Sequence, residues 1–132
     1  MGGLTALSDW DIDFRRGKVG ENLLEDIVET SEVKTDYRWQ ETGNVYIEFE
    51  CWYNASQTWK DSGISVSKAK YYTLVLPIGD NEPLVVSVPT QLLKEVVQEK
   101  GRYIECVISQ NPSKGHLIRV SDIMEIYLGT RT

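Results

Sequence analysis

The amino-acid sequence predicts a fold of the α/β (α+β) class, with a mixed β-sheet core flanked by helices. Two segments, residues 17–29 and 90–100, carry apolar residues at helical spacing, and shorter segments between and after them are typical of strands. The resulting order of helix, strands, helix and strands favours this class. With 132 residues, of which 41% are apolar, the chain suffices for one core, so we expect residues 1–132 to form a single domain.

The first predicted helix covers residues 17–29 and is amphipathic. Its apolar residues form a stripe over roughly half of the helix circumference. Glu21 and Asp26 fall just beyond the two opposite edges of this stripe. We therefore expect both carboxylates at the rim of the core.

Two strands are predicted next, over residues 32–39 and 44–52, and we expect them to form an antiparallel hairpin. In the first strand Glu32, Lys34 and Asp36 share one face because side chains alternate along a strand. In the second strand the apolar residues at 45, 47 and 49 share a face, and Glu48 and Glu50 share the other. Acidic groups would then project from both strands.

The rest of the chain is predicted from turn residues and apolar runs. Its longest apolar run, residues 71–78, indicates a central strand, and Pro89 and Gly101 bracket a helix. Residues 123–128 suit either a short strand or a helical turn. In order, the predicted segments are a loop at 53–67, strands at 71–78 and 84–88, the helix at 90–100, and strands at 102–109 and 116–120 around a turn at 111–115.

Charge is distributed unevenly along the chain. Residues 1–50 hold twelve acidic and five basic residues, whereas residues 51–132 hold eight acidic and nine basic ones. A local excess of carboxylates indicates either a cation site or a solvated acidic face that mimics or repels phosphate. A single histidine, His116, excludes a cluster of histidine ligands, and the net charge of −6 excludes a wide basic surface.

The N-terminal segment, residues 1–8, has no basic region and no apolar stretch of the ~20 residues that cross a bilayer. We therefore expect no membrane partner. Cys51 and Cys106 lie in predicted strands far apart in sequence, and we interpret them as reduced thiols. These features predict a cytoplasmic protein.

The fragment Glu32-Val33-Lys34 carries the clearest chemical signal. A strand projects its carboxylate and its ammonium side by side, where one can hold a divalent cation and the other can stabilise phosphate charge. The alternative is a solvated ion pair of little energetic value. Glu21, Asp26 and Asp36 lie nearby in sequence, and close carboxylates favour a bound cation because like charges repel. Mg²⁺ suits such oxygen ligands, with Mn²⁺ as an alternative.

Several separated blocks of the sequence occur together in one known family. Between about residues 11 and 76 the chain resembles the PD-(D/E)XK nucleases, and among them small phage-encoded endonucleases. The blocks that carry the resemblance are Arg16-Gly17-Lys18-Val19-Gly20-Glu21, Glu32-Val33-Lys34-Thr35-Asp36, Trp39, Thr42-Gly43-Asn44-Val45-Tyr46-Ile47-Glu48, Glu50-Cys51-Trp52 and Ser62-Gly63-Ile64.

The resemblance implies a restriction-endonuclease-like fold and a metal-dependent DNA endonuclease. Glu32 would be the principal metal ligand, Lys34 would stabilise the attacked phosphate or activate water, and Glu21 would bind or orient a second cation. The family aspartate usually lies on a strand of its own, but only five residues separate Asp26 from Glu32. Asp26 is slightly favoured for this role, and Asp36 and Glu48 are the alternatives.

Local basic and hydroxyl groups would contact DNA phosphates. Arg16, Lys18, Ser62 and Lys68 are the candidates, although each is also compatible with a solvated side chain. A homodimer would explain cleavage of both strands of a duplex, and the sequence leaves the oligomeric state open. If the chain is phage-encoded, the compartment is the host cytoplasm.

Two further functions stay open. The chain could be an acidic interaction protein that mimics DNA, or a DNA-binding module that retains the nuclease fold without cleavage. The position of Lys34 between Glu32 and Asp36 counts against a mimic, which favours uninterrupted negative charge. Retention of Glu32 and Lys34 argues against loss of cleavage.

Overall fold

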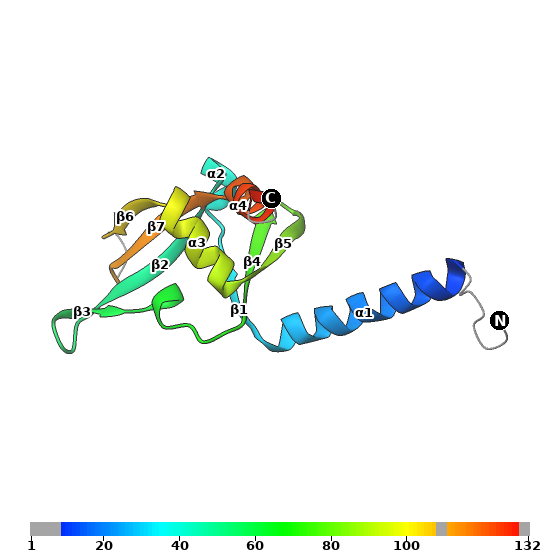
Figure 1. The fold of residues 1–132 in the computed structure, drawn as a ribbon. Coiled ribbons are helices and arrows are strands. Elements are labelled where there is room, and N and C mark those ends of the chain that lie inside the picture. The colour runs from blue at the N-terminus through cyan, green and yellow to red at the C-terminus, as the bar shows by residue number, and fades with distance from the viewer. Residues whose placement is uncertain (1–8, 108–110, 130–132) are drawn as a thin grey trace. The chain divides into compact units, whose positions relative to one another are not determined.

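The structure, a computed structural model, describes residues 9–107 and 111–129 (Figure 1). It divides into two compact units, Met1–Thr30 and Ser31–Thr132, and each is described by itself. In the part of the chain that the structure describes, no helix is both long and apolar enough to cross a membrane.

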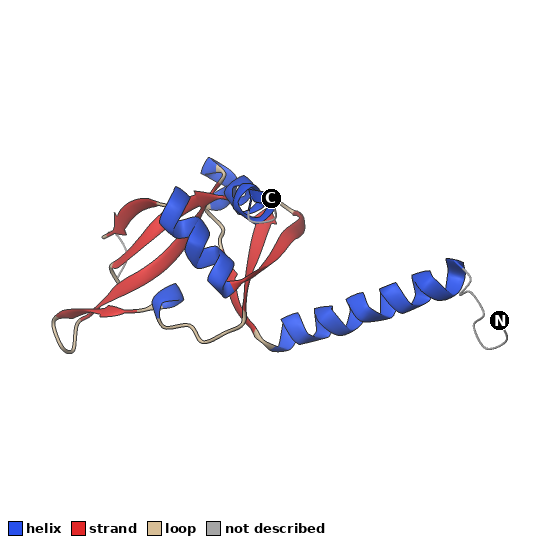
Figure 2. Cartoon of the chain, in the orientation of Figure 1, coloured by secondary structure: helices blue, strands red, loops and turns tan. Residues whose placement is uncertain are grey.

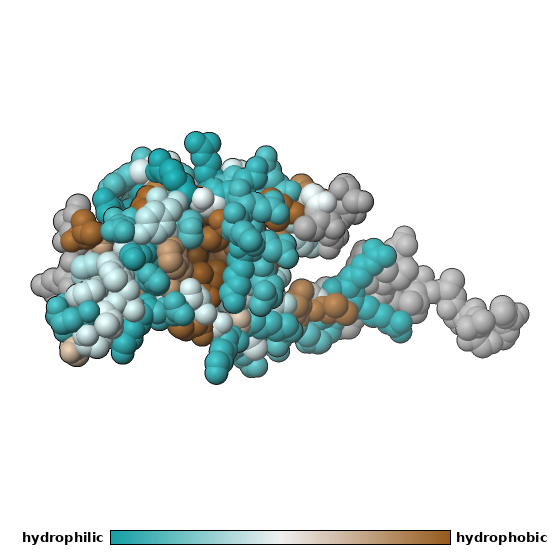
Figure 3. Space-filling model, turned by 60° about the vertical axis from the view of Figure 1, so that its left-hand side comes forward, coloured by the Kyte–Doolittle hydropathy of each residue, from teal (hydrophilic) through white to brown (hydrophobic). Residues whose placement is uncertain are grey.

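The first unit contains helix α1, Asp9–Glu29, which begins earlier than the predicted helix. Its apolar stripe is exposed, with Val19, Leu24 and Val28 each at least 60% accessible. Figure 3 shows brown, hydrophobic surface on α1. Glu21, which we expected at the rim of a core, is exposed as well.

The second unit contains two β-sheets (Figure 2). The three-stranded sheet has the order β1-β4-β5, and β1 runs parallel to β4. The four-stranded sheet has the order β3-β2-β7-β6 and is antiparallel throughout. The strands are β1 (Ser31–Thr35), β2 (Asn44–Tyr53), β3 (Thr58–Asp61), β4 (Tyr71–Ile78), β5 (Asn81–Pro89), β6 (Arg102–Cys106) and β7 (Ser113–Arg119).

Among the described residues, the second unit also contains three α-helices and one short 3₁₀ helix. The α-helices are α2 (Trp39–Thr42), α3 (Thr90–Lys100) and α4 (Val120–Gly129), and the 3₁₀ helix η1 covers Gly63–Ser65. The predicted α+β class is therefore confirmed.

The core lies where α3 covers strands of both sheets. Leu93 and Val96 of α3 are fully buried, and they belong to one hydrophobic cluster with Val45 and Ile47 of β2. Leu74 of β4 joins the same cluster from the other sheet. One face of β2 is thus used for packing, and the opposite face, with alternate residues, is left for a site.

The predicted hairpin of residues 32–39 and 44–52 is wrong. Strand β1 ends at Thr35 and pairs with β4, while β2 belongs to the other sheet. Trp39, expected at the end of a strand, begins α2, and its indole N–H donates to the Pro77 carbonyl at 2.8 Å. Alternation along a strand reveals its faces but not its partner, and the long apolar strand β4 is the partner here.

The segment predicted as a loop, residues 53–67, is partly ordered into β3 and η1. Strand β3 pairs with the end of β2 and places Trp59 opposite Trp52, with ring centroids 5.6 Å apart. This cross-strand aromatic pair stabilises a hairpin that a polar composition did not suggest.

The second half of the chain follows the prediction more closely. Strand β4 and helix α3 have the predicted bounds, and the segment at 123–128 is part of helix α4. Strand β7 begins at Ser113, inside the predicted turn. Residues 108 and 109 of the predicted strand 102–109 lie outside the described residues.

Candidate active site

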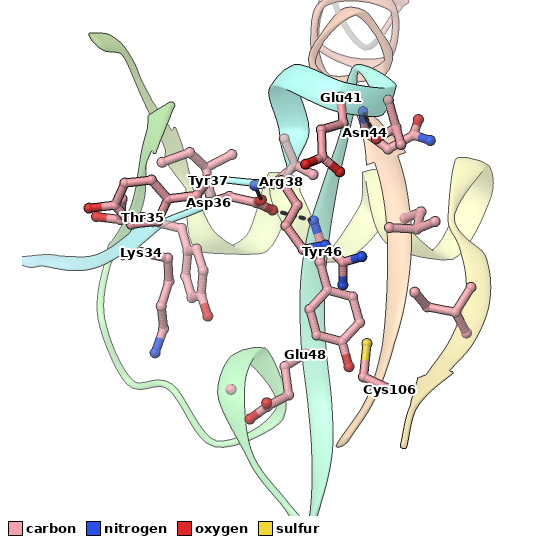
Figure 4. A pocket seen from close by; sticks show the side chains of 17 residues that line it. Lys34, Thr35, Asp36, Tyr37, Arg38, Glu41, Asn44, Tyr46, Glu48 and Cys106 are labelled. Carbon is pink, nitrogen blue, oxygen red and sulfur yellow. Dashed lines mark hydrogen bonds between the residues drawn. The ribbon is translucent and has the colours of Figure 1, made fainter. Parts of the chain in front are cut away.

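A cavity of about 550 Å³ opens where the two sheets meet (Figure 4). On one side it is bounded by β1, β4 and the turn that follows β1, and on the other by β2, β6 and β7. Three of the predicted site residues line it, namely Lys34, Asp36 and Glu48. The other lining residues are Thr35, Tyr37, Arg38, Glu41, Thr42, Asn44, Val45, Tyr46, Gly63, Tyr72, Leu74, Ile104, Cys106 and Leu117.

Glu32 and Lys34 lie side by side on β1, as the sequence predicts. The Lys34 ammonium is 3.3 Å from the Glu32 carboxylate, and both side chains are about half exposed. Solvent weakens such a pair, so its contribution to folding is small. The pair leaves both groups accessible to solvent, and of the two only Lys34 lines the cavity.

Glu48 enters the cavity from β2, and the segment after β3 holds its carboxylate. The Ser62 hydroxyl donates to a Glu48 carboxylate oxygen at 2.8 Å, and Ser62 itself is buried. Gly63 follows at φ +53°, and a Cβ atom there would collide with the main-chain carbonyl of Glu48. Only glycine allows this close approach, which explains the Ser-Gly sequence at this point.

A β-bulge separates Glu48 from Glu50, which we expected on the same face. Glu48 lies opposite Gly115 of β7, and the register then shifts so that Glu50 lies opposite Lys114. Adjacent residues of β7 point to opposite faces, so Glu50 points away from the cavity. There it forms an ion pair of 3.4 Å with Lys114. The prediction of a shared face is wrong because an extra residue inverts the alternation.

Tyr72 of β4 connects the two carboxylates electrostatically. The side chain is 2% exposed, and burial, together with the charges of Glu32 and Glu48, raises the pKa of Tyr72 to about 12. Tyr72 is also the register partner of Glu32. Both glutamates thus act on one phenol, although they come from different sheets.

Asp36 lies at the cavity wall, but both oxygens of its carboxylate accept hydrogen bonds from backbone amides. One oxygen accepts from the amides of Arg38 and Trp39 at 3.0 and 3.1 Å, and the other accepts from the amide of Tyr46 at 2.9 Å. Asp36 thus ties the turn after β1 to β2 (Figure 4). This arrangement favours a structural role for Asp36 over the metal-ligand role considered from the sequence.

The floor of the cavity is formed by Tyr46 and its neighbours. The Tyr46 ring lies against Gly115, where a side chain would overlap with it, and its hydroxyl is 2.7 Å from the Ser113 hydroxyl. Burial raises the pKa of Tyr46 to about 12, partly offset by the Ser113 hydrogen bond and reinforced by Cys106. Cys51 and Cys106 are both free thiols.

His116 lies outside the cavity. It precedes Leu117 on β7, so the two side chains point to opposite faces, and only Leu117 lines the cavity. The His116 ring stacks on Phe49 with centroids 5.0 Å apart, and burial lowers the pKa of His116. A role as general base at the cavity is therefore not supported.

The remaining predicted residues fall into two groups. Glu21, Asp26, Arg16 and Lys18 lie on α1, in the first unit, where Lys18 pairs with Glu21 at 3.5 Å on the helix surface. The main-chain carbonyl of Asp26 accepts from the amide and the hydroxyl of Thr30. Lys68 is exposed in the segment between η1 and β4. It does not line the cavity.

Tyr72 is a cavity residue that the sequence conceals, and Arg38 adds a cation to the lining. Tyr72 lies within a continuous apolar run that indicates packing alone. Arg38 lies in the turn after β1, where its main-chain amide donates to Asp36, and it lines the cavity. The Arg38 side chain lies beside Tyr46 in Figure 4.

The donor set at the cavity suits a hard cation. Within residues 9–107 and 111–129, no group of three or more His, Cys, Asp or Glu side chains is close enough to hold a metal ion by itself. Mg²⁺ keeps several waters and binds through one or two carboxylates together with substrate phosphate. Glu48 is a carboxylate of this kind in the cavity lining, and Glu32, which does not itself line the cavity, lies beside the lining residue Lys34.

Comparison of the chain with models of known protein families, with curated proteins and with solved structures returned no match.

Proposed function

We propose that the protein is a divalent-metal-dependent DNA endonuclease of the PD-(D/E)XK superfamily, with a restriction-endonuclease-like fold. One observation carries this proposal. Lys34 of β1 and Glu48 of β2 line the same cavity although they belong to different sheets, and Glu32 lies 3.3 Å from Lys34. The Glu32–Lys34 motif and the position of Glu48 at the same cavity as Lys34 together support the proposal.

Glu32 and Glu48 would hold Mg²⁺ or Mn²⁺, and both act on the Tyr72 phenol. When bound, such an ion polarises a phosphoryl oxygen and lowers the pKa of its water. In this proposal Glu48 is the second acidic metal ligand, a role for which the sequence slightly favoured Asp26.

Lys34 would stabilise the negative charge that develops on the attacked phosphate. Its ammonium shares the β1 face with Glu32 and lies at the same end of the cavity as Glu48 in Figure 4. A phosphate held there would contact Lys34 directly. Glu21 and Asp26 of α1 stay predictions as further acidic groups, and Arg16, Lys18 and Lys68 as phosphate contacts.

The proposed partner is DNA. The proposed location is the cytoplasm, and it is the host cytoplasm if the chain is phage-encoded. Two copies related by a two-fold axis would cut both strands of a duplex, so we include a homodimer in the proposal.

Incubation of the purified protein with supercoiled plasmid and with a branched duplex, in Mg²⁺, in Mn²⁺ and in chelator, tests the proposal. We expect nicking only with a metal ion, and its loss in Glu32→Ala and Lys34→Ala. Glu82→Ala, on the exposed strand β5, is the matched control and should cut like the wild type. Absence of cleavage in both metals, or full cleavage by Lys34→Ala, would contradict the proposal.

A further inference from the structure

The cavity extends well beyond the groups that the proposed cleavage reaction uses. Its volume of about 550 Å³ lies within the range of roughly 300–1,000 Å³ that is typical of small-molecule sites. Lys34 and Glu48 lie toward one end of it in Figure 4, while Arg38, Glu41 and Asn44 lie toward the other. A phosphate at the first end would leave the remainder of the cavity unfilled.

The walls of this remainder suit a flat aromatic group. The apolar and aromatic side chains of Tyr46, Ile104 and Leu117 line it from the four-stranded sheet. Tyr72 and Leu74 line it from the other sheet and are almost fully buried. Apolar and aromatic walls of this kind can hold a nucleobase. An enzyme that moves a base out of the DNA stack needs such a pocket for it.

Arg38 adds a cation to this apolar space. Its main-chain amide donates to Asp36, and no carboxylate among the described residues forms an ion pair with its guanidinium. An unpaired guanidinium can bind a phosphate oxygen or a base edge, or stack on an aromatic plane. The cavity lining thus places two cations, Lys34 and Arg38, beside apolar walls and the carboxylates of Asp36, Glu41 and Glu48. The two cations are the groups in this lining that can bind the phosphate of a nucleotide.

We propose that the cavity takes up one nucleotide displaced from the DNA stack, with its phosphate toward Lys34 and its base against the wall formed by Tyr46, Ile104 and Leu117. The inference rests on the proposed function, because it assigns the substrate class of the same site. Extruding a nucleotide costs least where the base is already unpaired. The preferred substrate is therefore DNA with a bulged or mismatched nucleotide rather than perfect duplex.

The test compares two duplexes that differ by one unpaired nucleotide at the centre, bound in chelator so that no cleavage occurs. We expect the bulged duplex to bind at least about tenfold more tightly by fluorescence anisotropy. Leu117→Trp fills the cavity and should bring the two affinities within about twofold of each other. Val85→Trp adds the same bulk on an exposed strand and should keep the preference.

Arg38→Ala keeps the test decisive if Leu117→Trp does not fold, because Arg38 lies in an exposed turn. It should weaken binding of the bulged duplex more than that of the paired one, whereas Arg119→Ala should not. A preference that survives both cavity variants would reflect DNA flexibility and overturn the inference. Equal binding of the two duplexes, or no binding of either, by a protein that nicks plasmid would overturn the inference alone. Failure to bind either duplex by a protein that also fails to nick plasmid in Mg²⁺ and in Mn²⁺ would overturn both proposals.

Discussion

The Ser62 hydroxyl donates a 2.8 Å hydrogen bond to the Glu48 carboxylate. Two residues that the sequence assigned to different tasks, phosphate contact and metal binding, are therefore one unit. The hydrogen bond uses the Ser62 proton and orients the carboxylate toward the cavity. Ser62 is accordingly a positioning residue, which acts through Glu48.

We expect Ser62→Ala to shift the metal dependence of cleavage. Groups that orient a metal ligand typically contribute 10- to 100-fold in metal affinity. The Mg²⁺ concentration for half-maximal cleavage should rise about tenfold, while the rate at saturating Mg²⁺ stays near that of the wild type. Ser65→Ala removes an exposed hydroxyl from the same segment and serves as the control. An unchanged Mg²⁺ dependence would contradict the role of Ser62 in positioning a metal ligand.

Gly63→Ala should destabilise the protein far more than Gly79→Ala. The two glycines have nearly the same φ, +53° and +54°, so both substitutions carry the strain of a left-handed residue. Only at Gly63 would the new Cβ atom also meet the Glu48 carbonyl. We expect the free energy of unfolding to fall by about 1 kcal/mol in Gly79→Ala and by at least about 3 kcal/mol in Gly63→Ala. Urea unfolding measures both, and equal losses would contradict the close approach.

Asp36→Ala should lower the free energy of unfolding. The substitution leaves the amides of Arg38, Trp39 and Tyr46 without their acceptor, and the hydrogen bonds to the last two are partly buried. The expected loss is about 2 to 3 kcal/mol. Asp80→Ala, in the exposed turn before β5, should change stability by less than about 0.5 kcal/mol. A variant at Asp36 that is fully stable and lacks only metal affinity would restore the metal-ligand role.

Tyr72 makes stability depend on alkaline pH. Burial, Glu32 and Glu48 raise the pKa of its folded-state phenol to about 12, above the value near 10 of an unfolded chain. The folded state thus retains the proton longer, and the stabilisation is complete below pH 10 and is lost as the pH rises to 12. Between about pH 9 and 11.5, wild type should lose on the order of 1 to 2 kcal/mol more than Tyr72→Phe in urea unfolding. Parallel losses would show that Tyr72 titrates normally.

The sequence predicts those parts of the structure that depend on local signals. Helix α3 ends where Gly101 follows Lys100, and β4 ends where Pro77 and Gly79 interrupt an apolar run. The pairing of β1 with β4, instead of β2, depends on contacts between distant segments that alternation along a strand does not encode.

The candidate site shows the same division. The Glu32–Lys34 pair follows from spacing along one strand, and the structure has it at 3.3 Å. Glu48 was one of several alternatives, and the β-bulge that separates it from Glu50 has no signature in the sequence. Tyr72 was concealed because a tyrosine in an apolar run resembles any other core residue.

Glu48 and Glu50 provide the most direct test of the proposed active site. They are identical side chains two positions apart on β2, and the β-bulge places Glu48 at the cavity and Glu50 beside Lys114. Single-turnover cleavage of a labelled DNA duplex in Mg²⁺ should fall at least about 100-fold in Glu48→Gln and less than about threefold in Glu50→Gln. Equal effects of the two substitutions, or a larger effect at Glu50, would contradict the assignment of the cavity as the site of phosphodiester cleavage.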